Sequence, residues 1–373
     1  MMIGMIGKEL RRRKTTEDTE FHGVFDTKII FPPCNSVVKF WGVITILLVL
    51  LAVSAGPVFA QRTVTIKMAS PVPENTPWGL FFNQLAADWR KITNGEVEMI
   101  VYHNGVAGSE KEVVRNLRVN QIQAAVLSTY GLYEISPEVM TLSCPFLIRD
   151  DDELDLVLAE VKGELEEKIN AKGYFTLAWA RVGWVKFFSK QPVYMPEDLK
   201  KQKLGTIADQ SEMNHVFKTM GFQMIPVAHN DILIALNSNM VDAVFQSPVA
   251  VGSAQIFGLA RNMASINVAP FIGALVFNQR AWRAIPDKYK PQLIESVRRN
   301  EAQLDRAIRA MENEMIQTMG NYGLKVNQLS PAQEQLWCDE IGRAMPSLIG
   351  TTFDRGVYGH IEAIVRDYRS RQR

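Results

Sequence analysis

The side chains that could do chemistry are sparse in this chain and lack the spacing of a catalytic centre. The 373-residue sequence contains no GxSxG, HExxH, phosphate-loop or GxGxxG motif. Beyond residue 60 the histidines, His103, His215, His229 and His360, are scattered without metal-ligand spacing. Asp242 resembles a general acid only by residue type, and its place before an expected strand favours a turn. We therefore expect a binding protein, not an enzyme, with no cofactor and no metal site.

The composition is that of an ordinary globular protein. It is 47% hydrophobic and 22% charged, with a net charge of +1. A nucleic-acid-binding protein normally carries a basic excess, and a disordered chain is poorer in apolar residues, so both classes are excluded. Beyond residue 60 only Cys144 and Cys338 are present, far apart in sequence. Export would permit a disulfide between them, but two buried free thiols are favoured.

The first sixty residues resemble an export signal behind a long extension. Lys39 precedes an apolar run over residues 40–55, and a V-F-A tripeptide ends at Ala60. This pattern predicts a signal peptide cleaved after Ala60, with a retained membrane anchor as the alternative. Gln61 follows, so a lipoprotein anchor is not expected. Residues 1–38 lack a periodic apolar pattern and fit an upstream start codon chosen in error.

The rest of the chain alternates strands with helices. Strands are expected at 63–69, 96–102, 123–128, 174–181, 203–207, 223–227, 241–246 and 273–278. Helices are expected at 76–93, 109–117, 151–172, 213–220, 231–237, 287–320, 330–344 and 356–368. The tight β–α–β alternation between 195 and 248 implies parallel βαβ units, and the ligand crevice of such sheets lies at the carboxyl ends of the strands.

Six short segments occur in one order over about residues 64–345. They are GEV at 95–97, GSEKE at 108–112, PEDLK at 196–200, MGF at 220–222, LNSNMVDA at 236–243 and VFNQRAW at 276–282. Each is weak alone, but the ordered set resembles the extracytoplasmic solute-binding subunit of TRAP (tripartite ATP-independent periplasmic) transporters, the DctP-like family.

This resemblance implies an α/β, two-lobed periplasmic-binding-protein (Venus-flytrap) fold in which a long helix braces both lobes. Lobe I would comprise 63–183 plus 268–310, and lobe II 184–267 plus 311–373. A small-molecule ligand would bind in the interlobe cleft in the periplasm, and hinge closure would prepare it for a membrane permease of small and large subunits. An additional periplasmic helper protein, or a ligand sensor that does not transport, stays open as an alternative.

The chain departs from the family where its members bind carboxylates. Gly205 stands at the position of the usual clamping arginine, and Val185 follows Trp184 where a second arginine is common. Gln246 and Ser247 replace the first two residues of the usual ENP segment. A guanidinium matches a carboxylate and stays charged when desolvated, and a buried carboxylate without a partner costs several kcal/mol. We therefore expect a rather apolar ligand.

Aromatic side chains on the cleft-lining segments would then contact the ligand. The predicted ligand-binding residues are Trp78, Glu110, Tyr130, Trp184, Val185, Gly205, Phe245, Gln246 and Ser247. Trp179 is expected in the core, and Glu110 could instead cap a helix. The alternative is a carboxylate ligand held by a substitute cation, Lys186 or Arg181, although strand alternation turns Lys186 away from the face of Val185.

Overall fold

The computed structural model describes residues 63–208, 210–228 and 231–372, without the side chains of 300–302. The predicted extension over 1–38 and the signal peptide with its cleavage after Ala60 lie outside these residues. None of the described helices combines the length and the apolar character needed to cross a bilayer.

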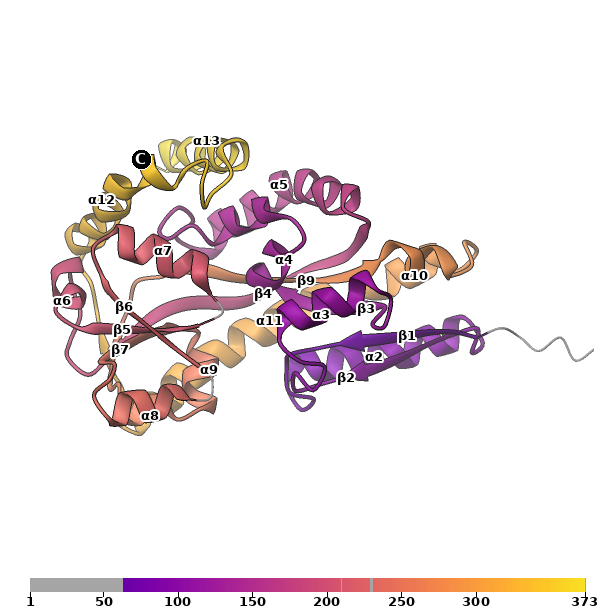
Figure 1. Cartoon of the computed structure of the whole chain (residues 1–373), viewed down its shortest axis with the longest axis horizontal. Helices are drawn as coiled ribbons and strands as arrows, with labels where there is room; N and C mark the ends of the chain where they lie inside the picture. The colour runs from indigo at the N-terminus through magenta and orange to yellow at the C-terminus, as the bar shows by residue number, and fades with distance from the viewer. Residues whose placement is uncertain (1–62, 209, 229–230, 373) are drawn as a thin grey trace, which may run out of the picture. The chain divides into compact units, whose positions relative to one another are not determined.

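The described chain is α/β, as predicted, and its strands and helices alternate (Figure 1). The strands are β1 Val64–Ala69, β2 Val97–Tyr102, β3 Ala124–Ser128, β4 Tyr174–Ser189, β5 Lys203–Ile207, β6 Gln223–Val227, β7 Ala243–Gln246, β8 Asn262–Ala264, β9 Ala269–Asn278 and β10 Lys325–Asn327. The helices are α2 Pro77–Ile92, α3 Glu110–Arg118, α4 Thr129–Tyr133, α5 Asp151–Ala171, α6 Pro196–Lys200, α7 Ser211–Thr219, α8 Ile232–Asn237, α9 Pro248–Ser253, α10 Gln279–Ala284, α11 Lys290–Asn321, α12 Pro331–Leu348 and α13 Arg355–Arg371, with 3-10 helices η1 Pro137–Ser143 and η3 Ile256–Gly258.

Local sequence explains where several helices begin. Thr76 caps α2 by accepting a hydrogen bond from the backbone N–H of Gly79, and Pro77 occupies the first helical position, where its missing N–H costs nothing. Ser109 and Glu112 form the predicted capping box of α3. These caps satisfy backbone donors that a helix leaves unpaired at its start, so they fix the first turn of each helix.

Two sheets share the long strand β4. The strand order is β2-β1-β3-β9-β4-β7-β5-β6, with β8 and β10 off this path. Residues 174–185 of β4 pair antiparallel with β9, whereas residues 186–189 pair with β7. The sequence predicted a strand that ends near residue 181. It is longer because β4 continues through an irregularity at Gly183, whose φ of 135° suits glycine.

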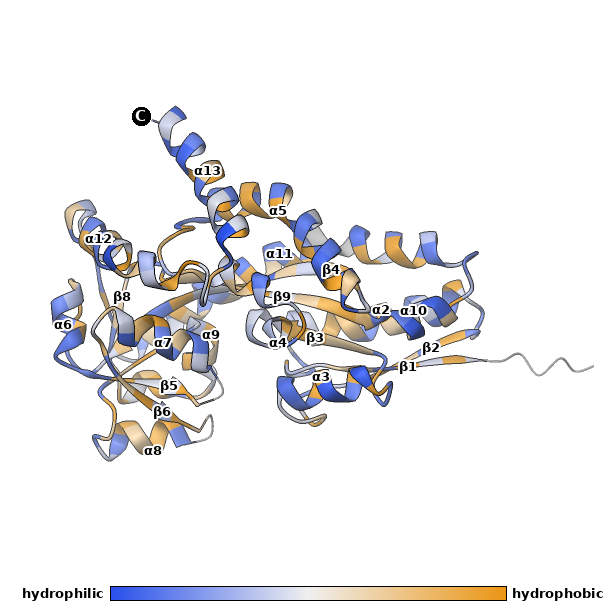
Figure 2. Cartoon of the chain, turned by 45° about the horizontal axis from the view of Figure 1, so that its top comes forward, coloured by the Kyte–Doolittle hydropathy of each residue, from blue (hydrophilic) through white to orange (hydrophobic). Residues whose placement is uncertain are grey.

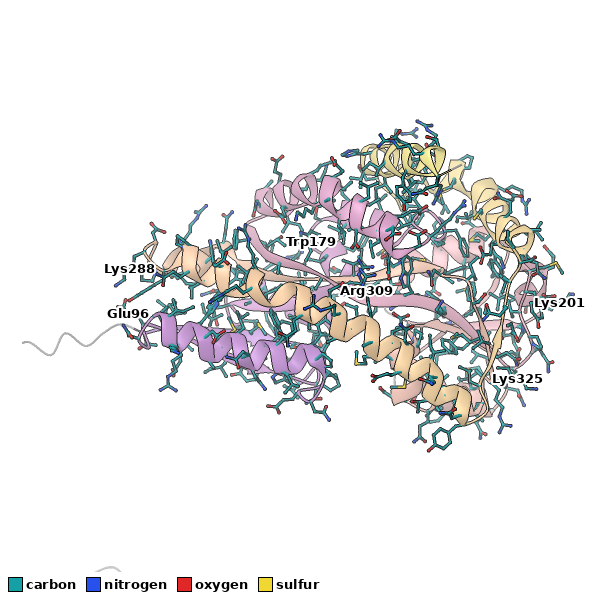
Figure 3. The ribbon with its side chains drawn as sticks, turned by 180° about the vertical axis from the view of Figure 1, so that it is seen from behind. Glu96, Trp179, Lys201, Lys288, Arg309 and Lys325 are labelled. Carbon is teal, nitrogen blue, oxygen red and sulfur yellow. The ribbon has the colours of Figure 1, made fainter. Side chains whose placement is uncertain are left out.

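Helix α11 connects the two sheets from outside. It packs against α2 beside the first sheet, against β4, and against α9 beside the second sheet. Leu293, Val297 and Ile308 lie in the core with α2 and β9, whereas Met319 lies in the core of the second sheet. In Figure 3, which views the molecule from behind, α11 crosses in front of the strands, with Lys288 just before its first turn and Arg309 near its middle. This is the bracing helix that the family resemblance implies; the exact lobe boundaries stay a prediction.

The hydropathy pattern agrees with this layering. Figure 2 shows hydrophobic residues along β4 and β9, and alternating hydrophobic and hydrophilic bands along helices such as α5. The buried stripe of α5 is formed by Leu154, Val157, Val161, Leu165 and Ile169. Such a stripe at helical spacing buries one face of the helix and leaves the other in water.

Candidate functional site

A small cavity lies between elements of the first sheet and elements of the second. From the side of the first sheet, α4, η1 and the start of β9 line it; from the side of the second sheet, α7 and β7 line it. The lining residues are Thr129, Tyr130, Ser143, Val185, Met213, Phe217, Phe245, Val268, Ala269, Pro270 and Phe271. Its volume of about 10 Å³ leaves room for about one water molecule. The wall is almost entirely apolar, with the hydroxyls of Thr129, Tyr130 and Ser143 as its polar groups.

The aromatic wall of the cavity is held from behind. The ring centroids of Phe217 and Phe245 lie 4.9 Å apart. The ring of Phe217 also packs against Phe187 and Phe222, with centroid distances of 5.9 and 5.8 Å. Phe217 and Phe187 have no exposed surface, and Phe245 retains 7%. Close packing of this kind leaves the rings few alternative rotamers, so the wall is pre-formed.

Glu110 positions the opposite wall without lining the cavity. Its carboxylate accepts hydrogen bonds from the backbone N–H and the hydroxyl of Ser128, each at 2.6 Å. It therefore satisfies donors at the start of α4, the helix that carries Tyr130. Burial raises the pKa of Glu110, and burial together with the nearby Glu110 and Glu212 raises the pKa of Tyr130. Tyr130 thus stays a neutral phenol beside the cavity.

Trp184 and Lys186 lie on the opposite face of β4 from Val185, because side chains alternate along a strand. The indole N–H of Trp184 donates to Asp151 at 2.9 Å. The ammonium of Lys186 donates to the backbone carbonyl of Ser265 at 2.9 Å and to Asn267 Oδ1 at 2.7 Å. Both residues line a separate, open pocket of about 450 Å³.

Burial of the positive charge of Lys186 lowers the free energy of unfolding, because the ammonium loses its hydration. The residue is only 8% exposed, and burial lowers the pKa of its ammonium to about 8, against a smaller opposing effect from carboxylates, chiefly Glu312. The same burial raises the pKa of Glu312. Glu312 also accepts a hydrogen bond from the backbone N–H of Trp184 at 3.3 Å.

Arg181 belongs to a network of five charges beside α11. It pairs with Asp151 and Asp155 and, at 3.0 Å, with Asp305. Arg309, labelled in Figure 3, contacts the same carboxylates, including Asp305 at 2.9 Å and Asp155 at 3.2 Å. The network links β4, α5 and α11, and Arg181 is absorbed in it, away from the interlobe cavity.

The other predicted site residues lie elsewhere. A Cβ atom on Gly205 would lie 3.1 Å from a methyl group of Val241, so this position faces a packed core. Gln246 pairs with Lys186 in the β4–β7 register, and the hydroxyl of Ser247 caps α9. Trp78 is buried in α2, stacked on Phe82 at 5.8 Å.

The structure therefore brings together Tyr130, Val185 and Phe245 of the predicted set. It places Trp78, Trp184 and Gly205 outside the cavity wall, and Glu110 behind it. Sequence reasoning missed Met213 and Phe217 as lining residues, because the periodicity that put them on the apolar face of a helix is the same signal that marks a core residue. Thr129, Ser143 and Phe271 carried no signal in the sequence.

Two further expectations concern Trp179 and the cysteines, which lie outside the cavity wall. Trp179 is half-buried on β4 and donates its indole N–H to Glu166 at 2.9 Å. Cys144 and Cys338 are free thiols, as favoured, but only Cys144 is buried, 3.9 Å from the sulfur of Met345, whereas Cys338 is half-buried. Burial raises the pKa of both thiols.

Comparison with known proteins decides the family. Residues 68–348 match the model of the bacterial extracellular solute-binding protein, family 7, known as DctP. The chain belongs to this family. It is thus a DctP-like solute-binding subunit of the TRAP type, one of a group of extracytoplasmic proteins that bind small molecules, work with membrane permease components and are not enzymes.

Individual relatives are distant but cover most of the chain. This chain is 24% identical over 281 residues to the C4-dicarboxylate-binding protein DctB of Bacillus subtilis. The match covers 74% of this chain and 80% of the relative. The chain is 23% identical over 253 residues to the 2,3-diketo-L-gulonate-binding periplasmic protein YiaO of Escherichia coli, covering 67% and 76%. A TRAP periplasmic solute-binding protein from Sulfurospirillum deleyianum, crystallised with bound succinate, has a TM-score of 0.71 and 23% identity, covering 80% of this chain and 98% of that one.

Proposed function

We propose that this protein captures a small, largely apolar ligand at the interlobe cavity, which must widen beyond its present volume of about 10 Å³ to admit it, and delivers the ligand to a TRAP permease of small and large membrane subunits. The observation that carries the proposal is the cavity wall. It contains four aromatic side chains, Tyr130, Phe217, Phe245 and Phe271, and no lysine, arginine or histidine among the described lining residues. Pockets of this composition favour apolar ligands that few polar groups orient.

Arg181 and Lys186 are the cations nearest in sequence to the lining residue Val185, and both have other partners. Arg181 pairs with three carboxylates, and Lys186 donates to Ser265 and Asn267 on the far face of β4. Turning either side chain into the cavity would break these hydrogen bonds and ion pairs, whose partners are partly exposed, and would desolvate the cation against an apolar wall. The hydroxyls of Thr129 and Ser143, hydrogen-bonded to each other at 2.9 Å, are better placed to orient one carbonyl or hydroxyl group of the ligand.

A second candidate is a carboxylate ligand. The acid-binding relatives favour it, since DctB is a C4-dicarboxylate-binding protein and the Sulfurospirillum protein holds succinate. This chain would then need a cation at the cavity that replaces the family arginines. The periplasmic location with cleavage after Ala60, and the alternatives of a non-transporting sensor or an additional periplasmic helper protein, belong to the same proposal.

A thermal-shift series with matched probes separates the two candidates. Succinate, benzoate, benzyl alcohol and cyclohexanone are added to the purified protein, and the midpoint of unfolding is recorded. A ligand that binds only the folded state raises this midpoint. The apolar proposal expects an increase with the uncharged probes and none with succinate. An increase with succinate alone would contradict it and return attention to Lys186.

A further inference from the structure

A second cavity, lined by other described residues, is larger than the interlobe cavity. It is a groove of about 600 Å³ between the loop that follows η1 and the helices α12 and α13, which lie together at the C-terminal end in Figure 1. Its residues are Cys144, Pro145, Phe146, Leu147, Arg149, Gln335, Cys338, Ile341, Gly342, Met345, Tyr358, Glu362, Val365, Arg366, Arg369 and Ser370. None of them lines the interlobe cavity, and a volume of this size suits a small molecule.

The floor of the groove is apolar. Phe146, Ile341, Met345 and Val365 are nearly or fully buried, at 3%, 6%, 7% and 1% exposure, beside the buried thiol of Cys144. Phe146 is fixed by the ring of Trp337 at 5.7 Å. A floor of this kind binds a hydrocarbon chain or ring through the surface that it removes from water.

The rim of the groove is positively charged. Three arginines, Arg149, Arg366 and Arg369, face one carboxylate, Glu362. Arg369 is already bound to Glu153 at 2.6 and 2.8 Å. In the part of the chain that the structure describes, the guanidinium groups of Arg149 and Arg366 have no hydrogen-bond or ion-pair partner.

We propose that this groove is a second ligand site, which takes an amphipathic carboxylate: an apolar chain or ring on the floor, with its carboxylate between Arg149 and Arg366. Charge complementarity selects this class. A guanidinium binds a carboxylate through paired charge-assisted hydrogen bonds, and the apolar floor accepts a chain that a dicarboxylate lacks. The site is independent of the ligand proposed for the interlobe cavity.

Cys338 offers a local readout of occupancy. It is half-buried on the groove wall, whereas Cys144 is 1% exposed on the floor. The alkylation rate of Cys338 by iodoacetamide at pH 8.5, located by peptide mass mapping, is measured against the concentration of decanoate below its micelle-forming range. Decanol and acetate serve as probes that lack the carboxylate and the chain, respectively.

Gly342 provides a matched pair of blocking and control variants. A Cβ at Gly342, on α12 in the groove, would meet nothing within 4 Å, and the same holds for Gly163 on α5, outside the groove. Gly342→Phe should therefore fill the groove without a backbone clash, and Gly163→Phe should leave it open. Both changes replace a helical glycine, so they affect helix propensity alike.

We expect decanoate to slow the alkylation of Cys338 in the unmodified protein and in Gly163→Phe. In Gly342→Phe, decanoate should no longer slow it. The combined Arg149→Gln and Arg366→Gln change should raise the half-protecting decanoate concentration about a hundredfold, roughly tenfold for each of the two charge-assisted contacts that are lost. Equal protection by decanol, or unchanged protection in the double arginine variant, would overturn the carboxylate assignment. A concentration-dependent dimer that Gly342→Phe abolishes would assign the groove to a second copy of the chain instead.

Discussion

Replacing Lys186 by methionine should change the stability of the fold in a pH-dependent way. Lys186 is 8% exposed, and burial lowers the pKa of its ammonium to about 8. In the unfolded chain the ordinary value of 10.5 applies. Between these two values the unfolded state binds more protons than the folded state, so stability rises with pH through this window. Below pH 8 the full cost of burying the charge is present.

The size of the effect follows from the two pKa values. The lowering from 10.5 to about 8 corresponds to about 3.5 kcal/mol, at roughly 1.4 kcal/mol for each unit, and about 3 kcal/mol of it falls between pH 7 and pH 10.5. The methionine variant lacks this titration. The free energy of unfolding of the unmodified protein, minus that of Lys186→Met, should therefore increase by about 3 kcal/mol between pH 7 and pH 10.5.

Urea unfolding followed by tryptophan fluorescence at five or six pH values measures this difference. Taking the difference between the two proteins cancels the contributions to the free energy of unfolding from tyrosines and carboxylates that titrate alike in both. Glu312 does not cancel, because its carboxylate interacts with Lys186. The same pair of measurements in a Glu312→Gln background isolates the lysine.

A flat difference between pH 7 and 10.5 in both backgrounds would refute the reasoning. It would mean that Lys186 keeps an ordinary pKa, as a solvated lysine does. A lysine of that kind could act as the carboxylate clamp of the alternative hypothesis, so the experiment also bears on the choice of ligand.

Three further substitutions test the site and its support. Phe245→Ala should destabilise the fold by about 3–5 kcal/mol and reduce co-purifying ligand about tenfold. Phe82→Ala, buried in the core around α2 and outside the cavity wall, should cost similar stability in urea and leave ligand occupancy by native mass spectrometry unchanged. Loss of occupancy in both would show that stability alone controls it. Arg181→Ala removes the more buried of the two arginines that Asp151, Asp155 and Asp305 share, while Arg309 stays. Because these carboxylates are partly exposed, the unfolding free energy should fall by about 1–2 kcal/mol; no measurable change would mean that the network is fully solvated. Gly205→Arg drives a side chain against Val241, so we expect a lower melting temperature and no succinate binding by calorimetry, and a gain of succinate binding would contradict the observed packing.

Much of the architecture could be predicted from the sequence because its signals are local. The capping box of Ser109 and Glu112 and the apolar stripe of α5 depend on neighbours within a few turns of helix. The predicted helix at 287–320 is α11, Lys290–Asn321. Strand ends were less accurate, since β4 continues past Gly183 only because the second sheet offers β7 as a new partner.

The site was predictable only where strand alternation and the family pattern agreed. Val185, which the family resemblance predicted at the cleft, lines the cavity, and it faces away from Lys186 as alternation requires. Trp184 was expected beside it, but the same alternation turns its indole to Asp151. The contribution of Phe217 depends on how α7 packs across the cavity, which no local pattern in the sequence encodes.

The central claim is that an apolar wall has replaced the acid-binding groups of the family. Native mass spectrometry of the purified protein, followed by denaturing extraction and identification of the released molecule, tests this claim most directly. We predict one uncharged or weakly polar apolar small molecule at near-equal stoichiometry with the protein. A bound di- or polycarboxylate or a sugar acid at that stoichiometry would contradict the account.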